Sequence, residues 1–274
     1  MTLIADTFKI GLVANAGESN LETIVRYHLA DGVAAITLDD GKVNVLGLVM
    51  QDQLNAAIDR AEADGAAVLL TGNARVFSGG FDLKVFKAGG PDVARMLTGG
   101  GGLCERLLTF PRPVVIAASG HAMAMGALML LCADYRIGIE SSARVQLNET
   151  AIGMTLPYLG VELARARLAT PWRNRALVNA EALTPSQAVA CGFLDEVVPV
   201  AALPDAAWAR TTALAALHPE AFVATRSRVH KPLLAAMKKA RLRDEEEWKR
   251  NFPLRLKAHC GAMPPSESPP RART

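Results

Sequence analysis

The sequence predicts an α/β fold in which a mostly parallel sheet is covered on both faces and a mainly helical region follows. Predicted strands and helices alternate along the first half of the chain, and the strands contain few polar residues, which is typical of a buried parallel sheet. Half of the 274 residues are hydrophobic but only 5% are aromatic. Much of the apolar content is Ala, Val and Leu, which favours close helix–sheet packing over a β-sandwich.

The first predicted elements are a strand over Val33–Leu38 and an amphipathic helix that follows a turn at Asp39–Lys42. Apolar residues recur at every third or fourth position of this helix, as a helix that buries one face requires. These residues are Leu46, Met50, Leu54, Ile58 and Ala61.

The next segments continue the alternation. Ala66–Leu70 is a short apolar run and predicts a buried strand, and Arg75–Phe77 extends toward a glycine-rich turn. A helix is expected over Phe81–Lys87. Thr98–Gly102 contains four consecutive glycines and is interpreted as a mobile loop, after which Leu103–Phe110 predicts another helix.

Pro113–Asp134 is apolar and long enough to resemble a membrane span. It is interrupted at Ser119-Gly120-His121 and again at Gly126, so we expect a buried strand over Val114–Ala118, a tight turn and a buried helix instead. No association with a membrane is expected.

The second half predicts mainly helices. Thr184–Gln187 has the composition of a helix start, with a capping Thr, Pro at the first position and Gln at the third. Gly192 ends that helix, and a strand over Phe193–Val198 follows. Helices are expected over Ala206–Leu217 and Glu220–Lys239.

These elements divide the chain into four expected parts: an N-terminal extension (1–20), a core (21–200), a helical C-terminal region (201–260) and a disordered Pro- and Ser-rich tail (261–274). The extension carries Asp6 and Lys9 within its apolar residues and lacks a basic start, so a secretory signal is not expected.

Charge and cysteine content exclude several functions. The net charge is +3, and no basic stripe alternates with stacking aromatics, so nucleic acid is not an expected partner, although an anionic small molecule is. The cysteines are far apart and form no CxxC or Cys/His cluster, so no metal site is expected and free thiols fit a cytoplasmic location. They are Cys104, Cys132, Cys191 and Cys260.

Two glycine-rich turns, Phe77–Asp82 and Gly120–Gly126, each lie between a predicted strand and helix. Such turns can leave backbone N–H groups pointing at one place, and two converging N–H donors form an oxyanion hole. The alternative is that the glycines only permit tight turns. A serine hydrolase is not indicated, because Ser78 is not in a Gly-x-Ser-x-Gly motif, and the Gly99–Gly102 run lacks the Lys of a phosphate loop.

Five segments, in this order and at this spacing, resemble the crotonase (enoyl-CoA hydratase/isomerase) superfamily, and the resemblance covers most of residues 30–200. They are Lys42–Leu46, Phe77–Leu83, Pro113–Asp134, the Asn148-Glu149 pair with Ile152-Gly153, and Thr184–Pro199.

The resemblance implies a crotonase-like spiral of β-β-α turns with a C-terminal helical region that mediates trimerisation, as a homotrimer or homohexamer. It implies an acyl-CoA substrate from fatty-acid breakdown and no cofactor, since coenzyme A enters with the substrate. The backbone N–H groups of Gly79 and Met125 would hold the thioester oxygen. Substrate-binding residues by the same resemblance are Lys42, Val43, Asn44, Val45, Ser78, Gly80, Asp82 and Leu83.

Family hydratases use two glutamates, one to activate water and one to move a proton at Cα. Here the resemblance places Glu149 at the second position and Leu128 at the first. Leucine transfers no proton, so a proton shuttle by Glu149, as in a Δ3,Δ2-enoyl-CoA isomerase, is favoured over hydration. Burial against Ile152 and Met154 is expected to raise the pKa of Glu149 toward neutrality.

Two alternatives remain: an acyl-CoA-binding protein without turnover, and a hydratase in which another group activates water. His121 is a candidate acid or base but is favoured as a structural residue, and Gln146, Asn148 and Tyr158 are unranked candidates to orient water or Glu149. Three further expectations concern Asp134 as a residue that pairs within the fold, Arg241–Arg250 as a solvated helix face, and Lys257 as a contact for CoA phosphates.

Overall fold

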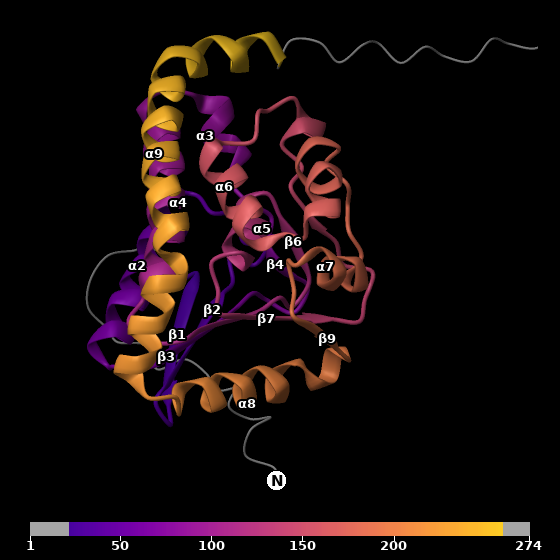
Figure 1. Cartoon of the computed structure of the whole chain (residues 1–274). Helices are drawn as coiled ribbons and strands as arrows, with labels where there is room; N and C mark the ends of the chain where they lie inside the picture. Colours follow the sequence, from indigo (N-terminus) through magenta and orange to yellow (C-terminus); the bar gives the residue numbers. More distant parts are fainter. Residues whose placement is uncertain (1–21, 260–274) are drawn as a thin grey trace, which may run out of the picture.

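The computed structural model describes the backbone of residues 22–259 and the side chains of residues 22–250 (Figure 1). The expected N-terminal extension and disordered tail lie outside the described residues, and so does the side chain of Lys257.

The larger sheet has six strands in the order β1-β2-β3-β5-β7-β9 within the described residues. β1 is antiparallel to β2, and every other neighbouring pair is parallel. The mostly parallel sheet predicted from the sequence is therefore confirmed. Its strands are β1 (Val25–Ala30), β2 (Val33–Leu38), β3 (Ala67–Thr71), β5 (Val114–Ala117), β7 (Tyr135–Ile139) and β9 (Glu196–Val198).

A second, three-stranded parallel sheet contains β4 (Val76–Ser78), β6 (His121–Met123) and β8 (Val145–Gln146). Each of these strands follows one strand of the larger sheet in sequence, so β3–β4, β5–β6 and β7–β8 form three successive pairs. Helices follow each pair, and the chain winds as a β-β-α spiral.

The helices fill the remaining chain. α2 buries Met50, Leu54, Ile58 and Ala61, as the apolar periodicity predicted. The expected helix start at Thr184 is also confirmed: Thr184 and Gln187 form a reciprocal capping box, and Gly192 ends the helix in the left-handed region. The helices are α2 (Leu48–Ala63), α3 (Leu83–Ala88), α4 (Pro91–Thr109), α5 (Met125–Leu130), α6 (Tyr158–Arg167), α7 (Pro185–Cys191), α8 (Leu203–Ala215) and α9 (Pro219–His259).

The interpretation of Thr98–Gly102 as a mobile loop is wrong, because all five residues lie inside α4. Packing explains two of the glycines. A Cβ on Gly99 would lie 2.2 Å from Oε1 of Gln51, and a Cβ on Gly100 would lie 2.5 Å from the ring of Phe81. The close approach of these two side chains offsets the low helix propensity of glycine.

Pro113–Asp134 forms β5, β6 and the short α5. The predicted strand and helix are present, but the additional strand β6 was missed. Asp134 follows α5 and accepts hydrogen bonds from the N–H of Val114 and from Arg226, both at 2.8 Å, so it pairs within the fold as expected. Among the described residues, no helix has both the length and the apolar composition needed to cross a membrane.

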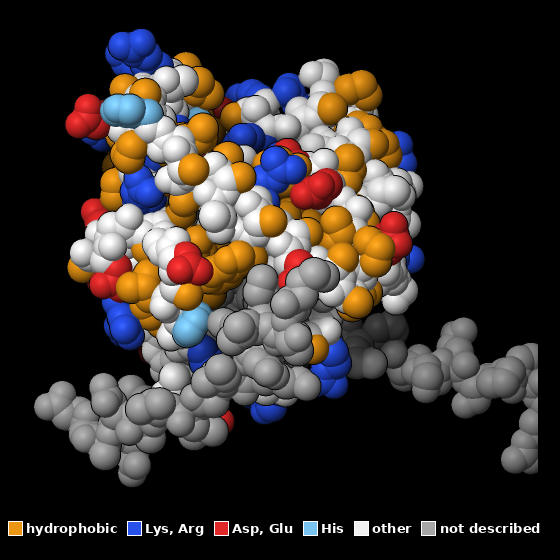
Figure 2. Space-filling model, turned by 90° about the horizontal axis from the view of Figure 1, so that it is seen from below, with side chains coloured by type: hydrophobic (Ala, Val, Ile, Leu, Met, Phe, Trp, Pro, Cys, Tyr) orange, Lys and Arg blue, Asp and Glu red, His pale blue; other side chains and the backbone are white. Residues whose placement is uncertain are grey.

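The C-terminal helices lie on two sides of the core (Figure 1). α8 covers one face of the larger sheet, where Leu203 and Ala207 pack with strand residues such as Leu69, Val115 and Ile137. Figure 2 views the molecule from this side, and its Lys and Arg side chains are dispersed among apolar and acidic ones. α9 runs back along α4 and α6.

Candidate active site

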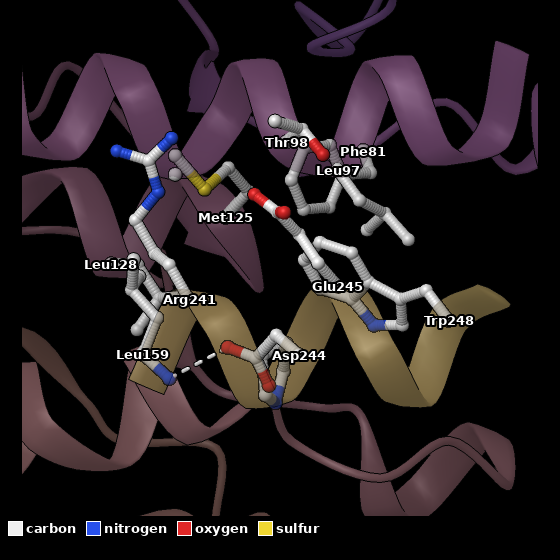
Figure 3. Close-up of a pocket in the computed structure, with 12 residues that line it drawn as sticks. Phe81, Leu97, Thr98, Met125, Leu128, Leu159, Arg241, Asp244, Glu245 and Trp248 are labelled. Atoms are coloured by element: carbon white, nitrogen blue, oxygen red, sulfur yellow. Dashed lines mark hydrogen bonds between the residues drawn. The ribbon is translucent and has the colours of Figure 1, made fainter. Parts of the chain in front are cut away.

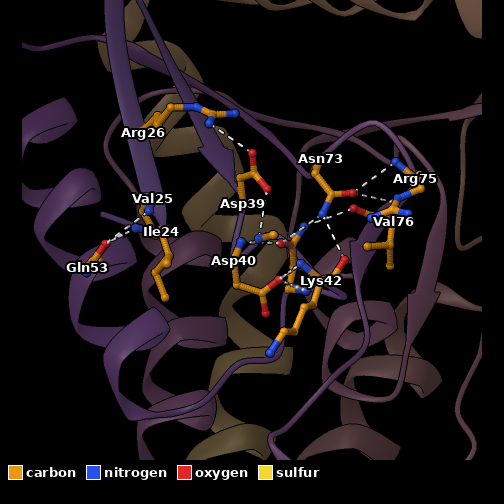
Figure 4. Close-up of polar contacts among 12 residues, drawn as sticks. Ile24, Val25, Arg26, Asp39, Asp40, Lys42, Gln53, Asn73, Arg75 and Val76 are labelled. Carbon is orange, nitrogen blue, oxygen red and sulfur yellow. Dashed lines mark hydrogen bonds and ion pairs between the residues drawn. The ribbon is translucent and has the colours of Figure 1, made fainter. Parts of the chain in front are cut away.

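Hydrogen bonds within the loop before α2 fix its shape. The Asp40 carboxylate accepts the N–H groups of Lys42, Asn44 and Val45 at 2.8–3.1 Å. The Asn73 side chain links this loop to β4, because it donates to the Lys42 carbonyl and accepts the N–H of Val76 (Figure 4).

This loop, the turn after β4 and the turn after β6 meet at one place. Leu46 N–H donates to the Gly80 carbonyl at 2.7 Å. A Cβ on Gly80 would lie 2.8 Å from Cβ of Ala124 and 3.3 Å from N of Met125. Gly80 also has φ +87°, a conformation that side chains rarely adopt, so glycine is required here. The structure therefore brings together three of the segments that carried the resemblance.

The N–H of Gly79 donates to the Val43 carbonyl at 2.7 Å, so it is not available to a thioester oxygen in this structure. The next N–H, of Gly80, donates to Oγ of Ser78 at 3.1 Å. Within the described residues, no hydrogen bond occupies the N–H of Phe81 or that of Met125, the first residue of α5. The prediction for Gly79 is thus wrong for this structure, and Phe81 is the residue of the same turn whose donor is free.

Two predicted substrate-binding residues use their side chains inside the protein. Asn44 is fully buried and donates to the carbonyls of Val76 and Phe77, both at 3.1 Å. Ser78 is also fully buried and donates to the Asn44 carbonyl at 2.8 Å. Their side chains hold the loop and the turn together, which corrects the expectation that they contact substrate.

The other predicted residues lie around the same turn. Asp82 caps α3 by accepting the N–H of Lys84 at 2.8 Å. Lys42, Val43 and Leu83 are exposed, and Val45 pairs with Gly80 in an isolated parallel bridge. A direct contact between these residues and the CoA part of a ligand stays a prediction.

Glu149 is a buried carboxyl group, and its Oε2 is a buried atom without a hydrogen-bond partner among the described residues. Removal from water penalises the charged form, and this raises the pKa of Glu149 to about 7. The raised pKa agrees with expectation, although Ile152, expected to help bury the carboxyl, is itself 45% exposed.

The structure also ranks the neighbours of Glu149. Oδ1 of Asn148 is a second buried oxygen without a partner in the described chain, so Asn148 is a candidate to bind water or to orient Glu149. Gln146 instead donates to the Ala180 carbonyl at 2.6 Å. Tyr158 is exposed beneath Arg243, and His121 is exposed and accepts the N–H of Arg144 at 3.2 Å, as a structural histidine would.

A cleft lies beside this turn, between α4, α5, α6 and α9 (Figure 3). Phe81, Met125 and Leu128 line it, so the two residues with free N–H donors and the residue at the missing glutamate position border the same space. Glu149 is not among the lining residues. It precedes the segment that leads to Pro157 and Leu159, both of which line the cleft.

α9 supplies the opposite wall through Arg241, Asp244, Glu245 and Trp248. Arg241 forms an ion pair with Glu105, and Asp244 is buried. The expectation that Arg241–Arg250 is a solvated helix face is therefore wrong for this side of the helix, because an apolar Trp and two engaged charges turn toward the core.

The structure offers no metal centre among its described residues, since no three His, Cys, Asp or Glu side chains there form a group with metal-binding geometry. Cys104, Cys132 and Cys191 are free and buried.

Comparisons with known proteins agree with this architecture. The family model described as Enoyl-CoA hydratase/isomerase matches residues 28–255. The chain is 30% identical over 248 residues to a probable enoyl-CoA hydratase of Rhodobacter capsulatus, which covers 88% of this chain and 96% of that protein.

Solved structures are similar over nearly their whole length. An enoyl-CoA hydratase/isomerase family protein of Pseudomonas syringae is 43% identical with a TM-score of 0.80, covering 81% of this chain and 97% of the other. A Mycobacterium tuberculosis protein, described as an enoyl-CoA isomerase in one structure and as a probable enoyl-CoA hydratase in another, is 39–40% identical with TM-scores of 0.78–0.80, covering 84–86% of this chain and 99% of the other.

The spiral of strand pairs and its C-terminal helices thus define a protein of the crotonase fold. The chain belongs to the enoyl-CoA hydratase/isomerase family, and it is an enzyme of that family.

Proposed function

We propose that this enzyme is a Δ3,Δ2-enoyl-CoA isomerase that uses Glu149 as its only proton carrier. The observation that carries the proposal is the buried, unpaired carboxyl of Glu149, whose pKa is raised to about 7. A group with a pKa near the working pH can both accept and return a proton. The position of a second hydratase glutamate holds Leu128, which has no titratable group.

In the proposed reaction, ionised Glu149 removes a proton from C2 of a 3-enoyl thioester. The C–H electron pair forms a C1–C2 double bond while the carbonyl π pair moves onto the thioester oxygen, and the product is a dienolate with double bonds at C1–C2 and C3–C4. The same carboxyl then delivers its proton to C4. The C3–C4 π pair forms the new C–H bond, the C1–C2 π pair moves to C2–C3, the carbonyl re-forms, and a 2-enoyl thioester results. The reaction consumes and releases no other reactant.

The dienolate oxygen requires hydrogen-bond donors, and we propose the backbone N–H groups of Phe81 and Met125 for this role. Both residues line the cleft, and no hydrogen bond of the described chain occupies either donor. One such donor contributes about 10²–10³ in rate in other oxyanion holes.

The test measures conversion of a 3-enoyl-CoA to the conjugated 2-enoyl-CoA by ultraviolet absorbance. Glu149→Gln keeps the size and loses the proton carrier, so we expect a fall in kcat of about 10²–10⁴. Glu140→Gln, at an exposed glutamate, is the control and should leave the rate unchanged.

Three outcomes would contradict the proposal. Isomerisation that survives Glu149→Gln would exclude the shuttle. Hydration of a 2-enoyl-CoA faster than isomerisation would favour a hydratase, with Asn148 as the candidate to hold water. Binding of both compounds without turnover would indicate an acyl-CoA-binding protein.

We further propose that the enzyme assembles as a homotrimer or homohexamer, as the family resemblance implies, and that it is cytoplasmic, as its free cysteines suggest. Sedimentation velocity of the purified chain tests the assembly, and a monomer at micromolar concentration would contradict it.

A further inference from the structure

We infer that Gly101 of α4 is a specificity-determining residue, which admits the hydrocarbon tail of an acyl-CoA into the cleft between α4 and α9. The inference rests on the proposed function in one respect: the thioester oxygen lies at Phe81 and Met125, where the cleft begins.

The cleft is suited to a hydrocarbon occupant. Its apolar walls include Leu97, Leu128, Leu159 and Trp248. Two of the three charged side chains beside them are engaged: Arg241 pairs with Glu105, and the Asp244 carboxylate accepts the N–H groups of Tyr158 at 2.8 Å and Leu159 at 3.0 Å. The third, Glu245, is half-buried at the wall of the cleft. Figure 3 shows Trp248 beside Asp244 and Glu245 on α9, facing Leu97 and Phe81 across the space.

Gly101 is a glycine that packing inside the protein does not require. Its neighbours Gly99 and Gly100 would place a Cβ within 2.2 and 2.5 Å of other atoms, whereas a Cβ on Gly101 would meet only Leu159 at 3.4 Å and Arg241 at 3.6 Å. These are ordinary van der Waals distances. Glycine inside a helix is less favourable than alanine by about 1 kcal/mol, so the residue leaves space at a cost to the helix.

The position of Gly101 in the cleft wall indicates that the space left by its missing side chain belongs to the cleft. Gly101 is buried, lines the cleft and faces the side chains of α6 and α9, so any larger side chain there would occupy the volume available to the tail. Gly102 lies next to it in the same helix, has no neighbour within 4 Å and does not line the cleft. Substitutions at Gly101 and at Gly102 both replace a glycine of α4, but only those at Gly101 change the cleft. Comparing them therefore separates an effect on tail binding from an effect on helix stability.

The experiment measures the dissociation constants of hexanoyl-CoA and dodecanoyl-CoA by calorimetry, on the full chain. Each methylene that enters the cleft of the wild-type protein should tighten binding about fourfold. Gly101→Leu should reduce the preference for dodecanoyl-CoA over hexanoyl-CoA by about tenfold or more, since at least two methylenes are displaced. Gly102→Leu should leave the ratio unchanged.

Two further variants keep the inference testable if Gly101→Leu misfolds. Trp248→Ala opens the far wall and should shift the preference toward longer tails, while Gly101→Ala adds one methyl group at van der Waals distance and should retain the fold. The inference is overturned if Gly101→Leu, shown to be folded by circular dichroism, keeps the wild-type ratio, or if Gly102→Leu changes it equally. If Gly101→Leu does not fold, the preference for dodecanoyl-CoA over hexanoyl-CoA is compared between the wild-type protein, Gly101→Ala and Trp248→Ala. The inference is then overturned if both variants keep the wild-type preference.

Saturated acyl-CoAs cannot isomerise, so the binding ratios are independent of turnover. A protein that shows the predicted ratios but does not isomerise 3-enoyl-CoA would contradict the proposed reaction and retain the role of Gly101.

Discussion

Glu149 combines burial with an unpaired carboxylate oxygen, and the combination sets its protonation. An exposed glutamate is fully ionised at neutral pH, whereas burial leaves Glu149 close to half ionised because its pKa is about 7. The sequence indicated this residue through the Asn148-Glu149 segment. The second unpaired oxygen, on Asn148, was not ranked from sequence, because only the folded chain shows which polar atoms lack partners.

The pH dependence of kcat/KM follows from this pKa. Only the ionised carboxylate removes the C2 proton, so we expect kcat/KM to rise with pH through about 7 and to be constant above it. Steady-state rates between about pH 5 and pH 9 provide the measurement. A profile that is flat down to about pH 5 would mean that Glu149 is not the base.

The donors proposed for an oxyanion hole illustrate a different limit of sequence reasoning. The pattern Phe77–Asp82 located the turn, but Val43, more than thirty residues earlier, decides which N–H of the turn is free. A contact between distant segments of this kind leaves no signal in the local sequence.

Gly80→Ala should displace these donors, because its Cβ would lie 2.8 Å from Ala124 and 2.9 Å from the carbonyl of Met123. We expect kcat to fall by about 10²–10³, the loss associated with one donor. Gly65→Ala is the matched control: Gly65 also has positive φ but no neighbour within 4 Å, so it should lose stability and keep kcat. Equal effects of the two variants on kcat would contradict the assignment.

At the level of elements, α4 shows how packing overrides propensity. Four consecutive glycines predict a loop, yet Gly99 and Gly100 admit Gln51 and Phe81, and the helix continues through them. The Gln51 side chain also donates to the carbonyls of Leu46 and Met96, so it joins α4 to the start of α2. The contacts that stabilise this helix come from Gln51 and Phe81, which lie outside α4 in the sequence, so the sequence of α4 alone does not reveal them.

Alanine substitutions in α4 should therefore have opposite effects. Gly102→Ala meets no atom and should raise the free energy of unfolding by about 0.5–1 kcal/mol. Gly100→Ala places its Cβ 2.5 Å from the Phe81 ring and should lower it by about 1–3 kcal/mol. Urea unfolding of both variants measures the difference, and stabilisation by Gly100→Ala would show that Phe81 does not pack as described.

The strands with continuous apolar runs were predicted, whereas the short strands β6 and β8 and also β1 and β7, of six and five residues, were missed. β2, β3 and β5 follow continuous apolar runs, whereas β6 and β8 have three and two residues and gain their pairing only within the second sheet. The hairpin of β1 and β2 did carry a signal: Asp31-Gly32 connects the strands with both residues at positive φ, the conformation of a tight hairpin turn.

For the whole molecule, the attachment of α9 to the spiral is the interaction that completes the cleft. Arg226 is 8% exposed and contacts the Asp134 carboxylate at 2.8 Å and the Arg112 carbonyl at 3.3 Å. Farther along the helix, Leu233, Met237 and Ala240 are buried in the main core. The sequence predicted the helix but not its length or its contribution to the cleft, because its charged residues obscure the buried face.

Arg226→Met would leave the mostly buried Asp134 carboxylate with only the N–H of Val114 as a described hydrogen-bond partner. We expect the free energy of unfolding to fall by about 3–5 kcal/mol, since removing one member of a buried ion pair leaves the other uncompensated. Arg228→Met, two residues along the same helix at an exposed position, is the control and should change stability little. Similar losses for both variants would show that the ion pair does not contribute as described.

The cleft wall on α9 also has a consequence for biosynthesis. Phe81, Met125 and Leu128 leave the ribosome more than one hundred residues before Trp248, so the spiral can form while its apolar cleft still lacks a cover. During that interval the nascent chain exposes the apolar residues that α9 later covers. Among the described residues, the last long helix to be translated, α9, is the one that closes the cleft.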